Sequence, residues 1–490
     1  MVSSDPVFDN AQREKSRRAF LSQSVYGFGS VALTSLLAKD HLLPLAQGAS
    51  EGAQRPSNLT VPKPPHFKER AKAVIFLFMA GGPSHIETFD PKPVLNELHG
   101  KPLPDSFGRV ITQQTTSDSL LLGSKRSFRS CGQSGIAISD LFPHLQTCAD
   151  ELAVIRSCHA DSVTHAAALY QMNSGRVLMG HPSLGSWVTY GLGSESQNLP
   201  SFVVMLDPDG TTVGGPPSWG SGFLPPVFQG TLFRSGEFPI LNLRNPSGRT
   251  RGRTRSSLDL LTQLNQESPQ HRNDPELEAR TASYELAFRM QQHAPEAVDL
   301  TQETEATHHL YGIDKTETQE FGRRCLLARR LVERGVRFVQ LYCGGGPGNL
   351  TWDGHGDIEE NHLRMAGQSD QPVAGLLQDL RLRGLLDDTL VIWGGEFGRT
   401  PMSQGSTGRD HSPFGFSMWM AGGGIKGGQT VGATDEVGLR AVENRNHVHD
   451  IHATILHLLG LDQYDLSYLH QGREEKLTDI GGQVIESIIA

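Results

Sequence analysis

The chain has 490 residues, with 44 Lys and Arg against 53 Asp and Glu, and a formal net charge of −9. This length suffices for one large domain or for two to three ordinary ones, and the acidic balance without a basic patch disfavours binding to nucleic acid. The five cysteines form no CxxC pair, which excludes a zinc ribbon or a disulfide-dense scaffold and leaves one or two disulfides open. Twenty histidines, several of them close to carboxylates, are the first indication of metal chemistry.

Residues 1–49 have the pattern of a twin-arginine export signal. Ser16-Arg17-Arg18-Ala19-Phe20-Leu21 supplies the arginine pair, and an uncharged, moderately apolar stretch runs from Ala19 to Ala38. Ala46-Gln47-Gly48 then offers small residues for cleavage. We therefore expect passage through the twin-arginine export machinery to the periplasm or the medium, with a retained N-terminal anchor as an open variant. No later stretch approaches the roughly 18 apolar residues of a membrane helix, so we expect no membrane span in the mature chain.

The rest of the chain shows the pattern of an α/β domain that follows a proline-rich linker at residues 50–70. Ala73–Met79 is a continuous apolar run that ends at Gly81-Gly82-Pro83, which fits a parallel strand buried on both faces. Comparable runs recur at Leu152–Ile155, Phe202–Leu206, Val336–Tyr342 and Thr389–Trp393.

Helical patterns lie between several of these runs. Leu376–Leu386 and Ile451–Leu461 are apolar at helical spacing, and Glu285–Gln292 is so more weakly. The alternation predicts a mostly parallel central sheet with helices on both faces. We expect a single domain over residues 71–490, with a loop-rich insertion at about 207–275 that is rich in Gly, Pro, Arg and Ser.

Ligands of such sheets bind beyond the carboxyl ends of the strands, and polar residues gather there in four groups. The first group follows the first strand and includes His85 and Asp90. The second, Asp161 to Arg176, places Thr164 and His165 where a loop meets a helix N-terminus, which favours an anion. Thr164 is a candidate nucleophile, although capping of the helix is the commoner use of a threonine there.

The third and fourth groups supply the strongest metal candidates. Asp353 and His355 lie two residues apart in a glycine-bounded loop, so that a carboxylate and an imidazole can bind one divalent ion. Glu396 follows a later strand, His411 lies in a short polar segment after it, and His449 lies at the start of the last strong helix.

The order of these motifs resembles the alkaline phosphatase superfamily, which includes sulfatases and cofactor-independent phosphoglycerate mutases. Leu390–Gly398 resembles the superfamily's hydrophobic strand followed by Asp-His-Gly, and Gly408–Ser412 resembles the Gly-Thr-Asp-His-Thr of the mutases. His449–Leu456 resembles a helix of the sulfatases. From about Pro65 to its end the chain most closely resembles the exported family called domain of unknown function 1501, which is assigned to the same superfamily. The strand followed by Gly-Gly-Pro-Ser-His and the Trp-Asp-x-His-Gly loop carry this resemblance.

The resemblance implies an α/β fold and metal-dependent hydrolysis of phosphate or sulfate esters, with a small molecule or a glycan as the substrate. Two departures affect the site. Phe397 stands where the superfamily has the histidine of Asp-His-Gly. Counted back from Arg176, the sulfatase frame places His165 at the nucleophile, so the sulfatase mechanism cannot be carried over unchanged. Thr164, His165 and Arg176 are the candidate catalytic residues.

These residues leave several chemical alternatives open. Asp353, His355 and His411, with His447 or His449 as additional candidates, would form one ion site, and Glu396, Asp90, His85 and His165 are the candidates for a second. One or two ions of zinc, manganese or iron suit such ligands. Metal-activated water or Thr164 with His165 as its base would attack the ester, and a phosphohistidine on His165 is a third mechanism. The rival hypothesis is a catalytically degenerate protein that binds a sulfated or phosphorylated glycan or an envelope partner. The oligomeric state is left open.

Overall fold

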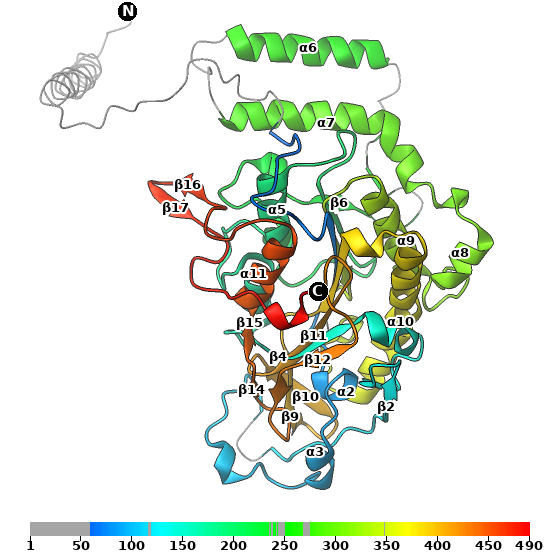
Figure 1. The fold of residues 1–490 in the computed structure, drawn as a ribbon, viewed down its shortest axis with the longest axis vertical. Helices are drawn as coiled ribbons and strands as arrows, with labels where there is room; N and C mark the ends of the chain where they lie inside the picture. Colours follow the sequence, from blue (N-terminus) through cyan, green and yellow to red (C-terminus); the bar gives the residue numbers. More distant parts are fainter. Residues whose placement is uncertain are drawn as a thin grey trace, which may run out of the picture. The chain divides into compact units, whose positions relative to one another are not determined.

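In the part of the chain that the structure describes, a nine-stranded sheet forms the centre of the computed structural model (Figure 1). Its strands are β1 (Ala73–Met79), β4 (Ala153–His159), β5 (Phe202–Met205), β6 (Thr231–Phe233), β7 (Phe338–Cys343), β8 (Thr389–Gly394), β11 (Phe416–Ala421), β12 (Gln429–Val431) and β15 (Asn446–His447). The order across the sheet is β12-β4-β11-β8-β1-β7-β5-β6, and β15 pairs with β4. Every pair is parallel except those of β11, which is antiparallel to β4 and β8. The prediction of a mostly parallel central sheet is confirmed.

The structure describes residues 59–490 apart from 116–118, 235, 237–238, 242, 244–249, 268–274 and 347. Residues Asn58–Ala490 group into one compact unit. The predicted export signal and the first part of the predicted linker lie outside the described residues.

Burial on both faces explains why β1 has no polar alternation. All seven of its residues are buried. Ile75, Leu77 and Met79 belong to the apolar core on one face of the sheet, whereas Val74, Phe76 and Phe78 belong to the core on the other. A strand covered on both sides needs apolar side chains at every position, which is why the apolar run predicted β1 with its observed bounds.

Helices cover both faces of the sheet. One face packs against α9 (Gln319–Glu333) and α10 (Ile358–Leu382), and the other packs against α4 (His165–Ser174), α5 (Leu184–Leu192) and α11 (Val448–Leu458). Figure 1 shows α9 and α10 on the side of the sheet opposite α5 and α11. The predicted helices Leu376–Leu386 and Ile451–Leu461 correspond to the C-terminal part of α10 and to most of α11.

The predicted loop-rich insertion contains a helix. Residues 251–267 form α6 (Arg251–Glu267), which lies beside α7 (Pro275–Val298). Two hydrogen bonds from the Arg255 guanidinium to the Glu285 carboxylate, 2.6 and 2.7 Å long, join them. Arginine, glycine and serine dominate the first turns of α6, so its composition resembled a loop.

Besides eight 3-10 helices, short elements complete the described chain. They are the helices α2 (His85–Thr88), α3 (Pro93–Glu97) and α8 (Glu305–Leu310), and four hairpin pairs: β2 (Phe128–Cys131) with β3 (Ile136–Ser139), β9 (Gly398–Gln404) with β10 (Gly408–Ser412), β13 (Ala433–Thr434) with β14 (Ala441–Glu443), and β16 (Tyr468–His470) with β17 (Arg473–Glu475). Of these, the β9–β10 hairpin contributes to the site described below.

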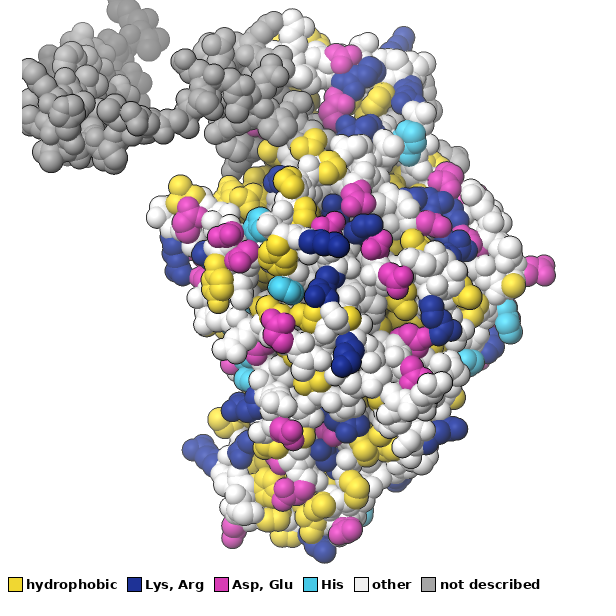
Figure 2. Space-filling model, in the orientation of Figure 1, with side chains coloured by type: hydrophobic (Ala, Val, Ile, Leu, Met, Phe, Trp, Pro, Cys, Tyr) yellow, Lys and Arg dark blue, Asp and Glu magenta, His cyan; other side chains and the backbone are white. Residues whose placement is uncertain are grey.

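All five cysteines are buried and unpaired, so neither of the disulfides left open by the sequence forms. Among the described helices, none combines the length and the apolar character required to span a bilayer. On the face shown in Figure 2, basic and acidic side chains alternate, without a continuous basic patch.

Candidate metal centre

Four candidate residues meet at the carboxyl edge of the sheet. His165 is the first residue of α4, which follows β4, and Asp353 and His355 lie in the loop between β7 and α10. His411 lies on β10, in the hairpin that follows β8. Because β4, β7 and β8 are parallel, the segments that follow them emerge at the same edge of the sheet. Residues far apart in the sequence therefore come together here.

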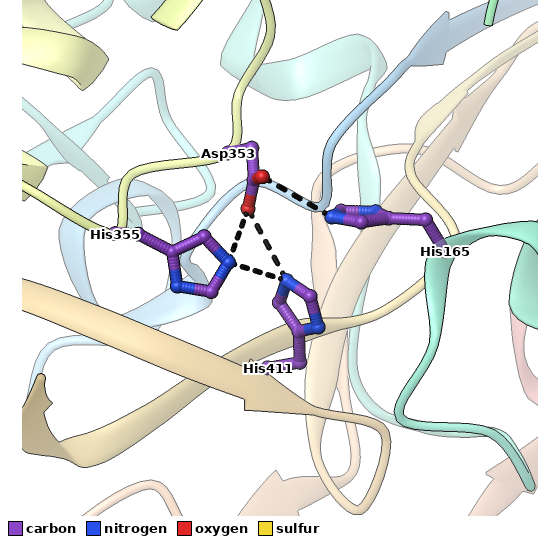
Figure 3. Close-up of side chains that lie close together, drawn as sticks. All are labelled: His165, Asp353, His355 and His411. Carbon is purple, nitrogen blue, oxygen red and sulfur yellow. Dashed lines mark hydrogen bonds and ion pairs between the residues drawn. The ribbon is translucent and has the colours of Figure 1, made fainter. Parts of the chain in front are cut away.

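The ligand atoms of these four residues point at one another (Figure 3). One nitrogen or oxygen from each lies within 4.8 Å of those of the others. Asp353 Oδ1 lies 2.9 Å from His355 Nε2 and 3.2 Å from His411 Nε2, and Asp353 Oδ2 lies 3.3 Å from His165 Nε2. His355 Nε2 and His411 Nε2 are 2.8 Å apart. Within the described residues, no other set of three or more His, Cys, Asp or Glu side chains has this geometry.

Each of the three histidines is oriented by an acceptor at its other ring nitrogen. His165 Nδ1 lies 2.7 Å from Glu396 Oε1, and His411 Nδ1 lies 2.8 Å from the carbonyl oxygen of Val163. His355 Nδ1 contacts Gln404 Oε1. A ring nitrogen that faces an oxygen acceptor carries the proton, so the Nε2 lone pairs are left free to bind a cation.

The charges of the site favour a cation. Burial alone would raise the pKa of Asp353, but its close contacts with His165, His355 and His411 and the charge of Arg399 hold that pKa well below its usual range. Asp353 is therefore ionised. Burial, together with the positive charges of Arg399 and His165, lowers the pKa of His411 to about 4, so His411 is neutral at pH 7.

His165 has the opposite shift. Burial alone would lower its pKa, but hydrogen bonds to Asp353 and Glu396, and the charges of both carboxylates, outweigh burial and raise the pKa to about 9. Without a metal ion, His165 therefore carries the positive charge that lies between the two carboxylates. A bound cation takes the place of that proton, because a histidine binds a metal only when it is neutral.

The glycine turn after β1 fits closely against this centre. Gly81 has φ +105°, and a Cβ built on it would lie 2.7 Å from the Asp353 nitrogen and 2.8 Å from that of Trp352. The Gly81 N–H donates to both carboxylate oxygens of Glu396, at 3.0 and 3.2 Å. The turn thereby positions Glu396, which in turn orients His165.

Arg399 and Phe397 also contact the candidate ligands. The Arg399 side chain is fully buried, and its Nη2 donates to Asp353 Oδ1 at 2.7 Å. The Phe397 ring lies 5.0 Å from the His165 ring and 4.5 Å from the His411 ring, centroid to centroid. Phe397 thus packs against two of the candidate ligands, at the position where the resemblance leads one to expect a further histidine.

The predicted metal ligands do not all come together. Asp353, His355 and His411 lie in the group, and Glu396 contacts it through His165. Asp90 instead pairs with Lys92 at 3.0 Å and accepts a hydrogen bond from Thr434. Elsewhere, His85 Nε2 bonds to the carbonyl oxygen of Gly438 and His449 Nε2 to that of Gly175, both at 2.8 Å.

The three predicted catalytic residues separate in the same way. His165 lies in the group as a candidate ligand. Thr164 occupies the N-cap position of α4 with an exposed side chain, and its Oγ1 lies 3.1 Å from Ser162 Oγ. Arg176 forms an ion pair with Asp479.

Sequence reasoning missed the residues that hold the ligands. Arg399 follows Glu396 within the same polar segment, and a charged residue in that position was the available signal. Gln404 showed no signal, because its contact with His355 depends on the pairing of β9 with β10. Val163 acts through its carbonyl oxygen, which no side-chain pattern reveals.

The fold and the site define an α/β protein with a candidate metal centre at the carboxyl edge of its sheet. The chain belongs to the family described as "Protein of unknown function (DUF1501)", whose model matches residues 71–489. No curated protein matches the chain.

Among solved structures, the chain is similar to the alkaline phosphatase from the Antarctic bacterium TAB5, at 10% identity and a TM-score of 0.32, over 81% of this chain and 99% of that one. It is similar to the PsFucS1 sulfatase from Pseudoalteromonas sp. at 13% identity and a TM-score of 0.34, over 80% and 68%. It is also similar to the lipoteichoic acid synthase LtaP from Listeria monocytogenes at 9% identity and a TM-score of 0.33, over 83% and 77%.

Proposed function

We propose that this protein is an exported, metal-dependent hydrolase of phosphate or sulfate esters. One observation carries the hydrolase proposal: ligand atoms of four residues from three distant segments lie within 4.8 Å of one another. Three imidazoles and a carboxylate suit zinc, manganese or iron. The sequence of residues 16–48 supports export.

The residues around the centre support a reaction at an anionic ester. His165 begins α4, a helix of ten residues whose N-terminal N–H groups and dipole favour a nearby anion. A phosphate or sulfate group is such an anion. A divalent ion, when bound, supplies Lewis-acid stabilisation of the charge that develops on the ester oxygens. Asp353 and the three histidines would hold that ion at the side of the anion site.

The first prediction tests the ion and the reaction together. We expect the metal-replete protein to hydrolyse an aryl phosphate or an aryl sulfate, and the chelated protein to lose this activity. Asp353→Asn should lose the ion and at least about 100-fold of the rate, because it removes the carboxylate shared by all three histidines. Elemental analysis and release of the aryl alcohol are the measurements.

A matched variant tests whether metal binding depends on the four residues of the centre or on another nearby histidine. His449→Gln should keep its metal content, because His449 bonds to a backbone carbonyl and not to the group. Thr164→Ala reports the mechanism: loss of activity with metal retained would identify Thr164 as the nucleophile. The hydrolase proposal fails if metal-replete protein cleaves neither aryl ester and no phosphorylated or sulfated saccharide.

Phe397 favours a second candidate function, a protein that binds an anionic glycan without cleaving it. Its ring covers one side of His165 and His411. Retention of a sulfated or phosphorylated saccharide by the metal-loaded protein, with no release of sulfate or phosphate over days, would establish this alternative.

A further inference from the structure

A permanent positive charge lies directly behind the candidate metal centre. The Arg399 side chain is fully buried, and Asp353 is its carboxylate partner in the described part of the chain. Its Nε donates to the carbonyl oxygen of Gly82 at 2.9 Å, and its Nη2 also contacts that of Gly81. The guanidinium is thereby fixed in place, and it stays charged because arginine does not deprotonate in proteins.

The groups that could hold a second ion are already in use. Both oxygens of Glu396 accept the Gly81 N–H, and Oε1 also faces His165 Nδ1. Asp90 is neutralised by Lys92 at 3.0 Å. Among the described residues, the group around Asp353 remains the single set with the spacing of an ion site.

The charge of the site also limits the number of ions. Asp353 and Glu396 carry two negative charges, and Arg399 carries one positive charge. One divalent cation with three neutral histidines leaves a single net positive charge, whereas a second cation would leave three. The side chains of Glu396 and Arg399 are fully buried, and an uncompensated charge in such surroundings is strongly unfavourable.

We propose that the centre takes one divalent cation, and that Arg399 permanently supplies the second positive charge on Asp353. The proposal rests on the metal centre of the proposed function, but not on hydrolysis. Arg399 is buried and acts through Asp353, so it is a positioning residue that shares this carboxylate with the ion. Asp353 then bridges a cation and a guanidinium, and the guanidinium weakens the hold of the carboxylate on the cation.

A titration of the wild-type protein tests the number of ions. Metal-free protein is titrated with Co²⁺, followed by its visible absorption, and the ion content after dialysis against Zn²⁺ is measured by elemental analysis. The expected result is a break at one equivalent and one zinc per chain. Two tightly bound ions, or none, would overturn the proposal.

Variants of Arg399 test its role independently of the count. Arg399→Gln removes the charge, so its Co²⁺ affinity should rise at least about tenfold, because the ion no longer competes with a neighbouring cation for Asp353. Arg399→Lys keeps the charge and should bind Co²⁺ within about threefold of the wild type. An unchanged affinity in Arg399→Gln would refute the role given to the guanidinium.

Arg409→Lys is the matched control. Arg409 is as deeply buried in the same hairpin, but its charge is neutralised by Glu87 at 2.7 Å, so the variant should keep the wild-type Co²⁺ affinity. If the Arg399 variants do not fold, the wild-type titration still decides the number of ions. Absence of hydrolysis with one bound ion would refute the proposed function alone, whereas hydrolysis with two bound ions would refute this inference alone.

Discussion

At the scale of single residues, the three histidines of the centre are oriented by three different kinds of acceptor. Glu396 offers a carboxylate, Gln404 a side-chain amide and Val163 a backbone carbonyl. A carboxylate acceptor raises the basicity of the imidazole more than a neutral acceptor does. The strength with which His165 binds an ion should therefore depend on Glu396 more than that of His355 depends on Gln404 or that of His411 on Val163.

Glu396→Gln tests this dependence. The variant keeps a side-chain oxygen near His165 but removes the charge, so we expect the affinity for zinc to fall about 10–100-fold. Competition with a chromophoric chelator measures the affinity. Glu360→Gln, which removes an exposed carboxylate from the first turn of α10, is the control and should bind zinc as the wild type does. Equal affinities in the two variants would show that Glu396 does not support His165.

The sequence predicted those ligands that lie close together in the chain or within a recognisable motif, and it missed contacts that only the tertiary structure creates. Asp353 and His355 are neighbours in one loop, so their spacing alone suggested a shared ion. His411 was found from its motif, while His165 was assigned to catalysis or to a second ion site, because nothing in a linear pattern shows that α4 begins beside the loop after β7. Asp90, His85 and His449 have the right chemistry in the right segments, but their partners are supplied by the tertiary structure.

His452 gives a prediction about pH. It is fully buried, and its Nε2 donates to the Met172 carbonyl oxygen at 2.7 Å. Burial lowers its pKa from 6.5 to about 3, so between these values the unfolded chain binds more protons than the folded one. The stability that neutral His452 contributes is complete above pH 6.5 and is lost as the pH falls toward 3.

His452→Gln keeps a donor for Met172 but cannot be protonated. Between about pH 4 and pH 6, unfolding of the variant should therefore take up about one proton fewer than unfolding of the wild type. The slope of the unfolding free energy against pH should be smaller by the corresponding amount. Urea unfolding at a series of pH values measures this slope. An unchanged slope would mean that other groups control acid unfolding.

At the scale of elements, strands were predicted better than helices. A strand covered on both faces must be apolar throughout. The continuous apolar runs of the sequence therefore predicted β1, β5, β7 and β8. The start of α10 was missed because Asp357, which caps it by accepting from the N–H groups of Glu359 and Glu360 at 3.0 Å, belongs to a polar loop that resembles a site. Pro372 within the same helix also obscured its length.

The turn after β1 gives a prediction at this scale. In Gly81→Ala, the added methyl group would collide with the backbone of the Asp353 loop, so we expect a loss of about 2–4 kcal/mol in stability together with weaker zinc binding. Gly100 also has a positive φ, +76°, but nothing lies within 4 Å of a Cβ added there, so Gly100→Ala is the control. It should lose about 1 kcal/mol and keep its zinc affinity. Thermal unfolding and zinc titration measure both variants. The difference between them gives the effect of the steric collision apart from the strain of a positive φ.

At the scale of the whole described unit, the centre joins segments that the chain order keeps apart. Its ligands come from the start of α4, the loop before α10 and the β9–β10 hairpin. Leu169 of α4 belongs to the apolar core on one face of the sheet, and Trp352, next to Asp353, belongs to the core on the other face. An ion bound there would link both layers of the fold.

Thermal stability should therefore depend on the ion. At a free ion concentration about 100 times the Kd, binding to the folded state stabilises it by about 2.7 kcal/mol. For a unit the size of Asn58–Ala490, this corresponds to a rise in Tm of about 3 °C. Calorimetry with zinc and with a chelator measures the shift, and Asp353→Asn should show none. A wild-type Tm that is equal in both buffers would indicate that no ion binds the folded chain.

The distance in sequence between His165 and His411 also has a consequence for biosynthesis. A nascent polypeptide that has not emerged from the ribosome beyond β10 lacks the last of the four ligands, and no shorter product of interrupted translation can supply it. Capture of the cation would therefore distinguish chains translated through β10 from chains interrupted before it.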